Sequence, residues 1–355
     1  MSSSSESQAR TIAVLARPAS SKLNPYTNLL YQEVRKAGAT VESYSPARAL
    51  LGRYDIFHIH WPESVFNHGL LSAKLTTGAL LLAMRRQKQR GAKLVWTVHN
   101  LRAHDRRYPR QEAEFWRAFI PKLDGYFLLT PAGKRAALER FPELAQKAGF
   151  VVPHPHYRGC YPDSVTREQA RTTLNLPGAA RVLLFVGTIA NYKNVPELIH
   201  AFHSLPGDNL RLVIAGQPRT ALLWQQLKAA AQSDTRILLY AGHVKDVDLQ
   251  TYLRAANLVV LPFQEILNSG SAVLGLTFDR PVLMPRLGAA EDLEHLVGDA
   301  WVKLYEGRLG PEQLALALKQ AESLPERTLG QHLGPLSPEG VGQATVEAYR
   351  KLLTL

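Results

Sequence analysis

The chain has 355 residues, of which 46% are hydrophobic and 20% charged, and its formal net charge is +12. This length exceeds one ordinary hydrophobic core and predicts two domains, while the composition excludes an intrinsically disordered chain. A single cysteine, Cys160, excludes an internal disulfide and a cysteine-based metal site, so we expect a reducing, cytoplasmic location.

Residues 1–10 and the overall hydropathy predict neither a signal peptide nor a membrane span. The first ten residues are polar and rich in serine, without the apolar segment of a signal peptide. No window reaches the roughly 18 uncharged apolar residues that a membrane-spanning helix requires. We therefore expect contact with a bilayer to be peripheral, on the cytoplasmic face of the inner membrane.

The excess positive charge belongs to the first half of the chain. Residues 1–157 hold 23 lysines and arginines against 11 acidic residues, whereas the remainder holds 19 of each. A basic half indicates a polyanionic partner, such as an anionic membrane, a pyrophosphate-linked lipid or a nucleic acid, although an ordinary soluble surface has the same composition. The basic clusters lack interleaved aromatic residues and no binding motif occurs, so we expect no nucleic-acid partner.

Short apolar runs alternate with amphipathic segments, which is typical of parallel sheets built from βαβ units. In the first half the pattern predicts strands over 11–16, 40–44, 56–60, 93–98, 125–130 and 150–152 and helices over 24–37, 69–89, 111–120 and 132–141. A proline-rich connection, residues 153–162, follows. The pattern then resumes, with strands over 182–186, 210–215, 237–241, 258–262 and 281–284, helices over 195–203, 220–232, 246–255 and 271–278, and two more helices within 311–355.

These elements predict an α/β protein of two facing Rossmann-like domains with a cleft between them. We place the domains over residues 1–157 and 158–335 and expect a final helix over 336–355 to pack back on the first domain. Ligands of open α/β sheets bind at the carboxyl ends of the strands. A Rossmann dehydrogenase is disfavoured, because Arg17-Pro-Ala-Ser-Ser follows the first strand in place of Gly-x-Gly-x-x-Gly.

Two strand ends in the second domain suit a phosphate. Gly187 ends one strand, and Lys193 stands just before the next helix, where its charge adds to the amide dipoles. A tight turn with a solvated lysine is the simpler explanation. Asn268, Ser269, Gly270 and Ser271 precede another helix, and capping that helix needs only one of them. We therefore expect these four residues to bind a pyrophosphate.

Several short motifs occur in a fixed order in the second half. They are Phe185-Val-Gly187, Tyr192-Lys193-Asn194, Val213-Ile-Ala-Gly216, Ala255-Ala-Asn257, Leu261-Pro262, Gly275 and Arg280-Pro-Val282. Together they resemble the donor domain of the family-4-like glycosyltransferases, which have two facing Rossmann domains, the GT-B architecture. The resemblance covers about residues 182–285 and is weaker over the first half. It implies a nucleotide-sugar co-substrate, no cofactor, and a Lys193 that neutralises the donor diphosphate.

The chain departs from the family at three positions. Thr188 stands where the family often has an arginine, so one of two positive charges is missing. The family's two glutamates, eight residues apart, fall at Ile266 and Leu274, although Glu265 is a candidate to replace the first. Because that pair accompanies retaining transfer, its loss leaves an inverting displacement with a general base equally open.

The first domain supplies the candidate catalytic residues. His60 and Glu63 follow one strand, and the resemblance implies that a histidine at such a strand end contacts the donor sugar. His58 shares its strand face with His60, so one of the two is a candidate core residue. The candidates for a general base are Glu63, His104 and Asp105, in no established order.

Three further residues complete the expected site. His99 and Asn100 follow the next strand, and Arg158 lies in the proline-rich connection, from which it would reach the phosphates. Turn-forming prolines explain much of that connection by themselves. Nothing in the chain has metal-ligand spacing, so we expect transfer without a metal.

The expected acceptor is a lipid. Residues 70–82 are apolar and rich in small side chains, and residues 84–90 are basic, a combination that suits the surface of an anionic membrane or a buried helix with a solvated end. The chain is also similar to bacterial exopolysaccharide enzymes that transfer mannose from GDP-mannose to a lipid-linked oligosaccharide. We therefore predict a hexosyltransferase of cell-surface polysaccharide synthesis, with a non-hydrolysing sugar-nucleotide epimerase as the alternative enzyme.

Overall fold

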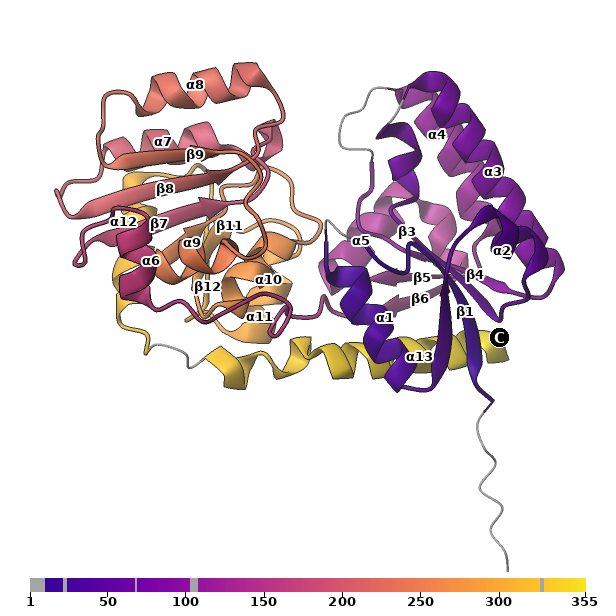
Figure 1. Ribbon diagram of the computed structural model, residues 1–355. Coiled ribbons are helices and arrows are strands. Elements are labelled where there is room, and N and C mark those ends of the chain that lie inside the picture. Colours follow the sequence, from indigo (N-terminus) through magenta and orange to yellow (C-terminus); the bar gives the residue numbers. More distant parts are fainter. Residues whose placement is uncertain (1–9, 22–23, 68, 103–107, 326–328) are drawn as a thin grey trace, which may run out of the picture. The chain divides into compact units, whose positions relative to one another are not determined.

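The computed structural model describes residues 10–21, 24–67, 69–102, 108–325 and 329–355. The chain divides into two compact units, which we describe separately (Figure 1). Unit 1 comprises Met1–Pro155 together with Pro338–Leu355, and unit 2 comprises His156–Ser337.

Unit 1 is built on a parallel six-stranded sheet in the order β2-β1-β3-β4-β5-β6. Its strands are β1 (Ile12–Arg17), β2 (Ala39–Ser43), β3 (Ile56–His60), β4 (Lys93–Thr97), β5 (Gly125–Leu128) and β6 (Ala148–Val151). Its helices are α1 (Tyr26–Lys36), α2 (Pro46–Leu51), α3 (Leu70–Gln89), α4 (Pro109–Phe119), α5 (Pro131–Arg140) and α13 (Pro338–Thr354), with short 3-10 turns η1 (Pro62–Asn67), η2 (Ile120–Lys122) and η3 (Pro142–Gln146).

The final helix, α13, packs against α1 within unit 1 (Figure 1). Its buried face carries Val341, Val346, Tyr349 and Leu352, which join the core around β1 and β3. The contact is close at Gly342, where a β-carbon would stand 2.5 Å from the β-carbon of Glu33. Helix α13 is therefore an integral part of the core of unit 1.

Unit 2 is built on a second parallel sheet in the order β12-β11-β10-β7-β8-β9. Its strands are β7 (Arg181–Val186), β8 (Leu210–Gly216), β9 (Ile237–Ala241), β10 (Leu258–Val260), β11 (Val282–Pro285) and β12 (Val302–Tyr305). Its helices are α6 (Arg167–Thr173), α7 (Val195–His203), α8 (Ala221–Ala231), α9 (Leu249–Ala255), α10 (Gly270–Thr277), α11 (Ala290–Val297) and α12 (Pro311–Glu322), with 3-10 turns η4 (Asn191–Lys193), η5 (Leu329–His332) and η6 (Gly334–Leu336).

The strand order fixes where each unit can bind a ligand. In unit 1 the chain direction across the sheet reverses between β1 and β3, and in unit 2 it reverses between β7 and β10. Loops that leave two such strands diverge and open a crevice at their carboxyl ends. The candidate residues after β3 and after β7 and β10 all lie at these reversal points.

The predicted α/β fold with two parallel sheets is confirmed. Strand β12 and helices α2, α6 and α11 were not predicted, because each is short and lacks a long run of apolar residues at a clear period. Among the described residues, no helix is long and apolar enough to cross a membrane.

Candidate active site

The backbone at the end of β7 approaches the backbone of β8 closely. A β-carbon on Gly216 would stand 1.8 Å from the carbonyl oxygen of Gly187, so only glycine fits there. Gly187 has a φ of +127°, a conformation that side chains disfavour. The two glycines leave the mouth of the β7–β10 crevice without side chains, which lets a ligand reach the backbone.

Lys193 lies at this crevice as a buried cation. Its Nζ atom is 3.5 Å from the position that a β-carbon of Gly187 would take, and 5.1 Å from the ring centroid of Phe263. The residue is only 8% exposed, and no hydrogen-bond acceptor or carboxylate among the described residues pairs with its ammonium group. Burial, with a smaller contribution from the Arg219 guanidinium, lowers the pKa of Lys193 to about 8. A cation of so little exposure is costly without a counter-charge, so Lys193 suits an anionic ligand.

Two serines at the start of α10 make different contacts. The Ser269 hydroxyl accepts a hydrogen bond of 3.1 Å from the Ala272 amide and caps the helix. The Ser271 Oγ atom lies 3.9 Å from the same β-carbon position of Gly187 that Lys193 approaches. Asn268 and Gly270 are half-buried. Ser271, in the first turn of α10, and Lys193, in turn η4, thus approach one point from two different elements.

A second cation, Arg219, was not foreseen. It lies in the loop after β8, and its amide donates a 2.9 Å hydrogen bond to the Ile189 carbonyl, which ties that loop to the β7 loop. Its guanidinium is close enough to influence the pKa values of Lys193 and Tyr192. No motif in the sequence marks this residue, because its position at the site depends on β7 and β8 being neighbouring strands.

Two other expected residues of unit 2 lie differently from Lys193. The Glu265 side chain is exposed, next to the buried Ile266. Arg158 forms an ion pair of 2.5 Å with the buried Asp279, which follows the last turn of α10. The ion pair therefore places Arg158 at the end of α10 opposite Ser269, where its charge is neutralised and its reach toward a phosphate is reduced.

In unit 1, the histidines that follow β3 and β4 are buried and paired. Both ring nitrogens of His60 are used, Nε2 with the Tyr31 hydroxyl at 2.6 Å and Nδ1 with His99 Nε2 at 3.0 Å. His60 is 1% exposed, and burial lowers its pKa to about 3. The expectation that His60 itself contacts a ligand is therefore revised, because the neutral ring has no nitrogen to spare. His60 instead supports His99, to which its Nδ1 atom is bonded.

His99 lies within an aromatic cage. The Trp61 ring stacks on it with centroids 4.1 Å apart, and Tyr26 meets its edge at 4.9 Å. Trp61 has a φ of +44°, an unfavourable conformation for a bulky residue, which the packing on His99 and Tyr26 maintains. Strained backbone of this kind gathers at functional sites.

Glu63, in turn η1, carries a buried carboxylate. One oxygen, Oε1, accepts a 2.6 Å hydrogen bond from the Asn100 amide, while Oε2 is buried without a hydrogen-bond partner. Burial raises the pKa of Glu63 to about 7, against the lowering effect of Asn100. Arg17, at the end of β1, is near enough to favour the charged form. A carboxylate that titrates near neutrality suits general base catalysis.

Two predicted candidates for the general base, His104 and Asp105, lie outside the described residues. Among the residues that are described, no group of histidine, cysteine, aspartate or glutamate side chains could hold a metal ion.

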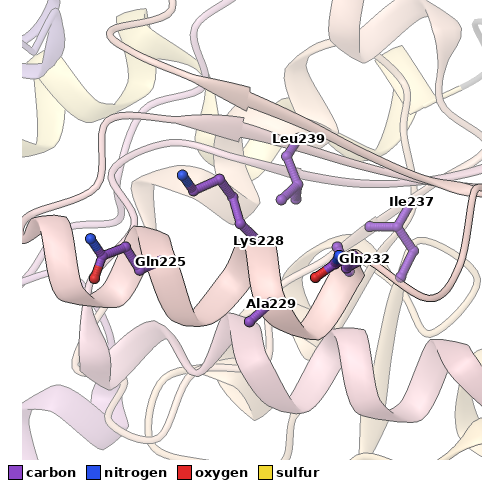
Figure 2. Close-up of a pocket in the computed structure, with 7 residues that line it drawn as sticks. Gln225, Lys228, Ala229, Gln232, Ile237 and Leu239 are labelled. Carbon is purple, nitrogen blue, oxygen red and sulfur yellow. The ribbon is translucent and has the colours of Figure 1, made fainter.

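An open hollow elsewhere in unit 2 does not belong to this site. Figure 2 shows Lys228 of α8, and Gln232 just after this helix, near Ile237 and Leu239 of β9. The hollow thus lies between α8 and β9, and neither Lys193 nor Ser271 lines it.

The fold is that of the glycosyltransferases with two Rossmann-like domains. Sucrose-phosphate synthase from Thermosynechococcus elongatus matches with a TM-score of 0.68 and 17% identity, over 97% of this chain and 100% of the other. HepE from Anabaena, solved in complex with UDP-glucose, matches with a TM-score of 0.62 and 11% identity, over 96% of this chain and 98% of the other.

Sequence comparison identifies the family. Residues 166–276 match the family described as glycosyl transferases group 1. A GDP-mannose:glycolipid 4-beta-D-mannosyltransferase of Xanthomonas campestris pv. campestris is 33% identical over 306 residues, which cover 85% of this chain and 81% of that protein. The chain belongs to the group 1 glycosyltransferases, and the predicted enzyme class is confirmed at that level.

Proposed function

We propose that this glycosyltransferase transfers mannose from GDP-mannose to a lipid-linked acceptor in cell-surface polysaccharide synthesis. The observation that carries the donor assignment is Lys193, a buried cation without a counter-charge at the β7–β10 crevice. The 33% identical relative is named for GDP-mannose, a glycolipid and a β-linked product. We expect transfer without a bound metal, because the cationic side chains of unit 2 provide the positive charge.

Unit 2 holds the donor in this proposal. Lys193 and the Ser271 hydroxyl bind the diphosphate beside Gly187, where no side chain blocks the backbone. Arg219 replaces the positive charge that Thr188 does not provide. As the bond between the anomeric carbon and the phosphate oxygen breaks, the departing diphosphate gains charge, and these cations stabilise it.

Unit 1 supplies the general base. A β-mannoside formed from an α-linked donor requires inversion, which one displacement at the anomeric carbon achieves with a base on the acceptor hydroxyl. Glu63 fits this role, because its Oε2 lacks a partner and its pKa is raised to about 7. The acceptor oxygen attacks the anomeric carbon, and Glu63 takes its proton. His99 and Trp61 line the neighbouring strand ends and orient the sugars.

Helix α3 provides the surface for the lipid. Leu71 and Leu75 are 72% and 66% exposed, and Leu82 follows on the same helix face. The basic end is partly committed to the fold, since Lys88 pairs with Asp124 and Arg90 bonds the carbonyls at the end of α2. The exposed leucines therefore favour peripheral membrane contact more than the charges do.

A thermal-shift panel tests the donor assignment. GDP-mannose, GDP-glucose, UDP-glucose and ADP-glucose are added to the wild type, Lys193→Met and the control Lys228→Met, which alters an exposed lysine of the same unit. We expect GDP-mannose to stabilise the wild type and the control most, and Lys193→Met hardly at all. If no nucleotide sugar stabilises the wild type, the donor site is wrong. Epimerised donor formed without acceptor would instead indicate an epimerase.

A further inference from the structure

A continuous chain of hydrogen bonds in the interior of unit 1 joins Tyr26 of α1 to His99, which follows β4, and passes through Tyr349 of α13. His58 Nδ1 is 2.6 Å from the Tyr349 hydroxyl, and His58 Nε2 is 2.7 Å from the Thr97 hydroxyl. Tyr349 in turn bonds the Tyr31 hydroxyl, which bonds His60. Tyr26 bonds Thr97 at one end, and His99 bonds His60 at the other.

Every member of this chain is neutral at physiological pH. Burial lowers the pKa values of the three histidines far below 6.5 and raises those of the three tyrosines above 10. Each neutral hydroxyl or imidazole carries one proton for hydrogen bonding. Seven groups joined by six bonds therefore hold seven protons, of which six fill the bonds.

The protons in such a chain can point in only two ways. An interior histidine uses both nitrogens, so it donates on one side and accepts on the other. An interior hydroxyl that donated to neither neighbour would bury an unsatisfied proton. All bonds therefore run from Tyr26 to His99, with every histidine protonated on Nδ1, or from His99 to Tyr26, with every histidine protonated on Nε2.

We propose that Tyr31 and Tyr349 are positioning residues that couple the tautomers of His58, His60 and His99, so that helix α13 sets the tautomer presented at the end of β4. The catalytic part of this inference rests on the proposed glycosyl transfer. Orientation of a histidine by the partner of its second nitrogen is a general device in catalytic sites. Here the orienting groups are Tyr31 and Tyr349, which lie near opposite ends of the amino-acid sequence.

A buried polar cluster that only stabilises the core is the alternative. Such a cluster would lose stability when a hydroxyl is removed, and two removals would cost more than one. In a relay, removal of the Tyr349 hydroxyl already interrupts the coupling. Removal of the Tyr31 hydroxyl as well therefore has no further effect. In a merely structural cluster, removal of the Tyr349 hydroxyl would also leave the tautomer of His60 unchanged, although only two hydrogen bonds separate the two residues.

Nitrogen-15 spectra of the full chain, labelled at histidine, test the coupling directly. We expect His58, His60 and His99, assigned from single substitutions, to show one shared tautomer in the wild type. Tyr349→Phe is expected to convert His60 and His99 to mixed or opposite tautomers. The control is Tyr126→Phe, which removes a hydroxyl from another tyrosine of the same sheet. Different tautomers in the wild type, or unchanged signals in Tyr349→Phe, would overturn the proposal.

Kinetics then test the consequence for transfer. We expect Tyr349→Phe and Tyr31→Phe each to lower kcat about tenfold with the donor KM unchanged, and the double variant to be no slower than either. Additive losses would overturn the relay. If the tautomers change as expected but the wild type transfers no sugar, the relay stands and the proposed function fails.

Discussion

The two units differ in the polar groups that they bury at the ends of their strands. In unit 1 the histidines and tyrosines behind β3 and β4 are neutral and bonded to one another. In unit 2 the buried Lys193 has no bonded partner among the described residues and faces a second cation, Arg219. The strand ends of unit 1 thus carry neutral groups bonded to one another, whereas those of unit 2 carry a cation that suits an anionic ligand.

The difference indicates how the work of transfer is divided. Satisfied networks hold their geometry, which suits groups that orient sugars and move one proton. A buried cation without a bonded partner, such as Lys193, binds an anion strongly at a cost to the stability of the empty protein. In the described part of unit 1, Glu63 Oε2 is buried without a hydrogen-bond partner, as are single atoms of Thr27, Gln87 and Trp96.

Glu63→Gln should give the largest effect on turnover. It keeps the shape and the Asn100 contact but removes the base, so we expect kcat to fall about 10²- to 10⁴-fold with donor binding retained. Wild-type activity should rise with pH through about 7, where Glu63 loses its proton. A variant with wild-type kcat would exclude Glu63 as the base.

The same carboxyl predicts a pH effect on stability. Its pKa is raised in the folded state, so the folded protein prefers the protonated form, and the stability that this form contributes is lost as pH rises from about 4.5 through about 7. We expect Glu63→Gln to unfold at a higher temperature than the wild type at pH 8 and to match it at pH 4. Equal melting temperatures at pH 8 would show that Glu63 is solvated.

Lys193→Met should separate binding from stability in unit 2. We expect donor affinity to fall about 100-fold, since a charge-assisted contact with the diphosphate is lost. Because the Lys193 pKa is lowered to about 8, its charged form destabilises the empty fold, and the variant should gain on the order of 1–3 kcal/mol at pH 7. Calorimetry measures both. A destabilised empty variant would mean that Lys193 is satisfied within the protein.

Ligands of open α/β sheets bind at the carboxyl ends of the strands, and this rule explains which residues of the candidate site could be predicted. Gly187, Lys193, His99 and Glu63 each follow a strand that the apolar pattern marks clearly. Tyr349 could not be predicted, because it lies 291 positions after its partner His58 and reads as one more residue of an amphipathic helix. The separate roles proposed for Ser269 and Ser271 could not be predicted either, because they depend on the residue at which α10 begins.

Arg219→Ala sharpens the contrast from the donor side. If Arg219 replaces the charge missing at Thr188, donor affinity should fall about two- to fivefold, as for an exposed charged contact. The pKa of Lys193 should rise, because a repelling neighbour is removed. Restoring the family's charge with Thr188→Arg in the Arg219→Ala background should recover binding. Failure of this rescue would separate Arg219 from the diphosphate.

Leu71→Ser combined with Leu75→Ser tests the surface of unit 1. We expect binding to vesicles of phosphatidylethanolamine and phosphatidylglycerol to fall several-fold, because two exposed apolar side chains of α3 are lost. Leu222→Ser is the control, since this leucine is 65% exposed on α8 of unit 2. Equal loss in both would indicate nonspecific adsorption rather than a membrane face on α3.

The smallest expected effect distinguishes two serines that stand two residues apart. Ser269→Ala removes the cap of α10 and should lower the free energy of unfolding by about 1 kcal/mol. Ser271→Ala should leave stability nearly unchanged and weaken donor binding a few-fold, because its hydroxyl lies beside Gly187 and Lys193. Chemical denaturation of both variants measures the free energy of unfolding, and donor titration measures their donor affinity. If both serines change only stability, the run before α10 is a helix cap, and the cations alone hold the donor.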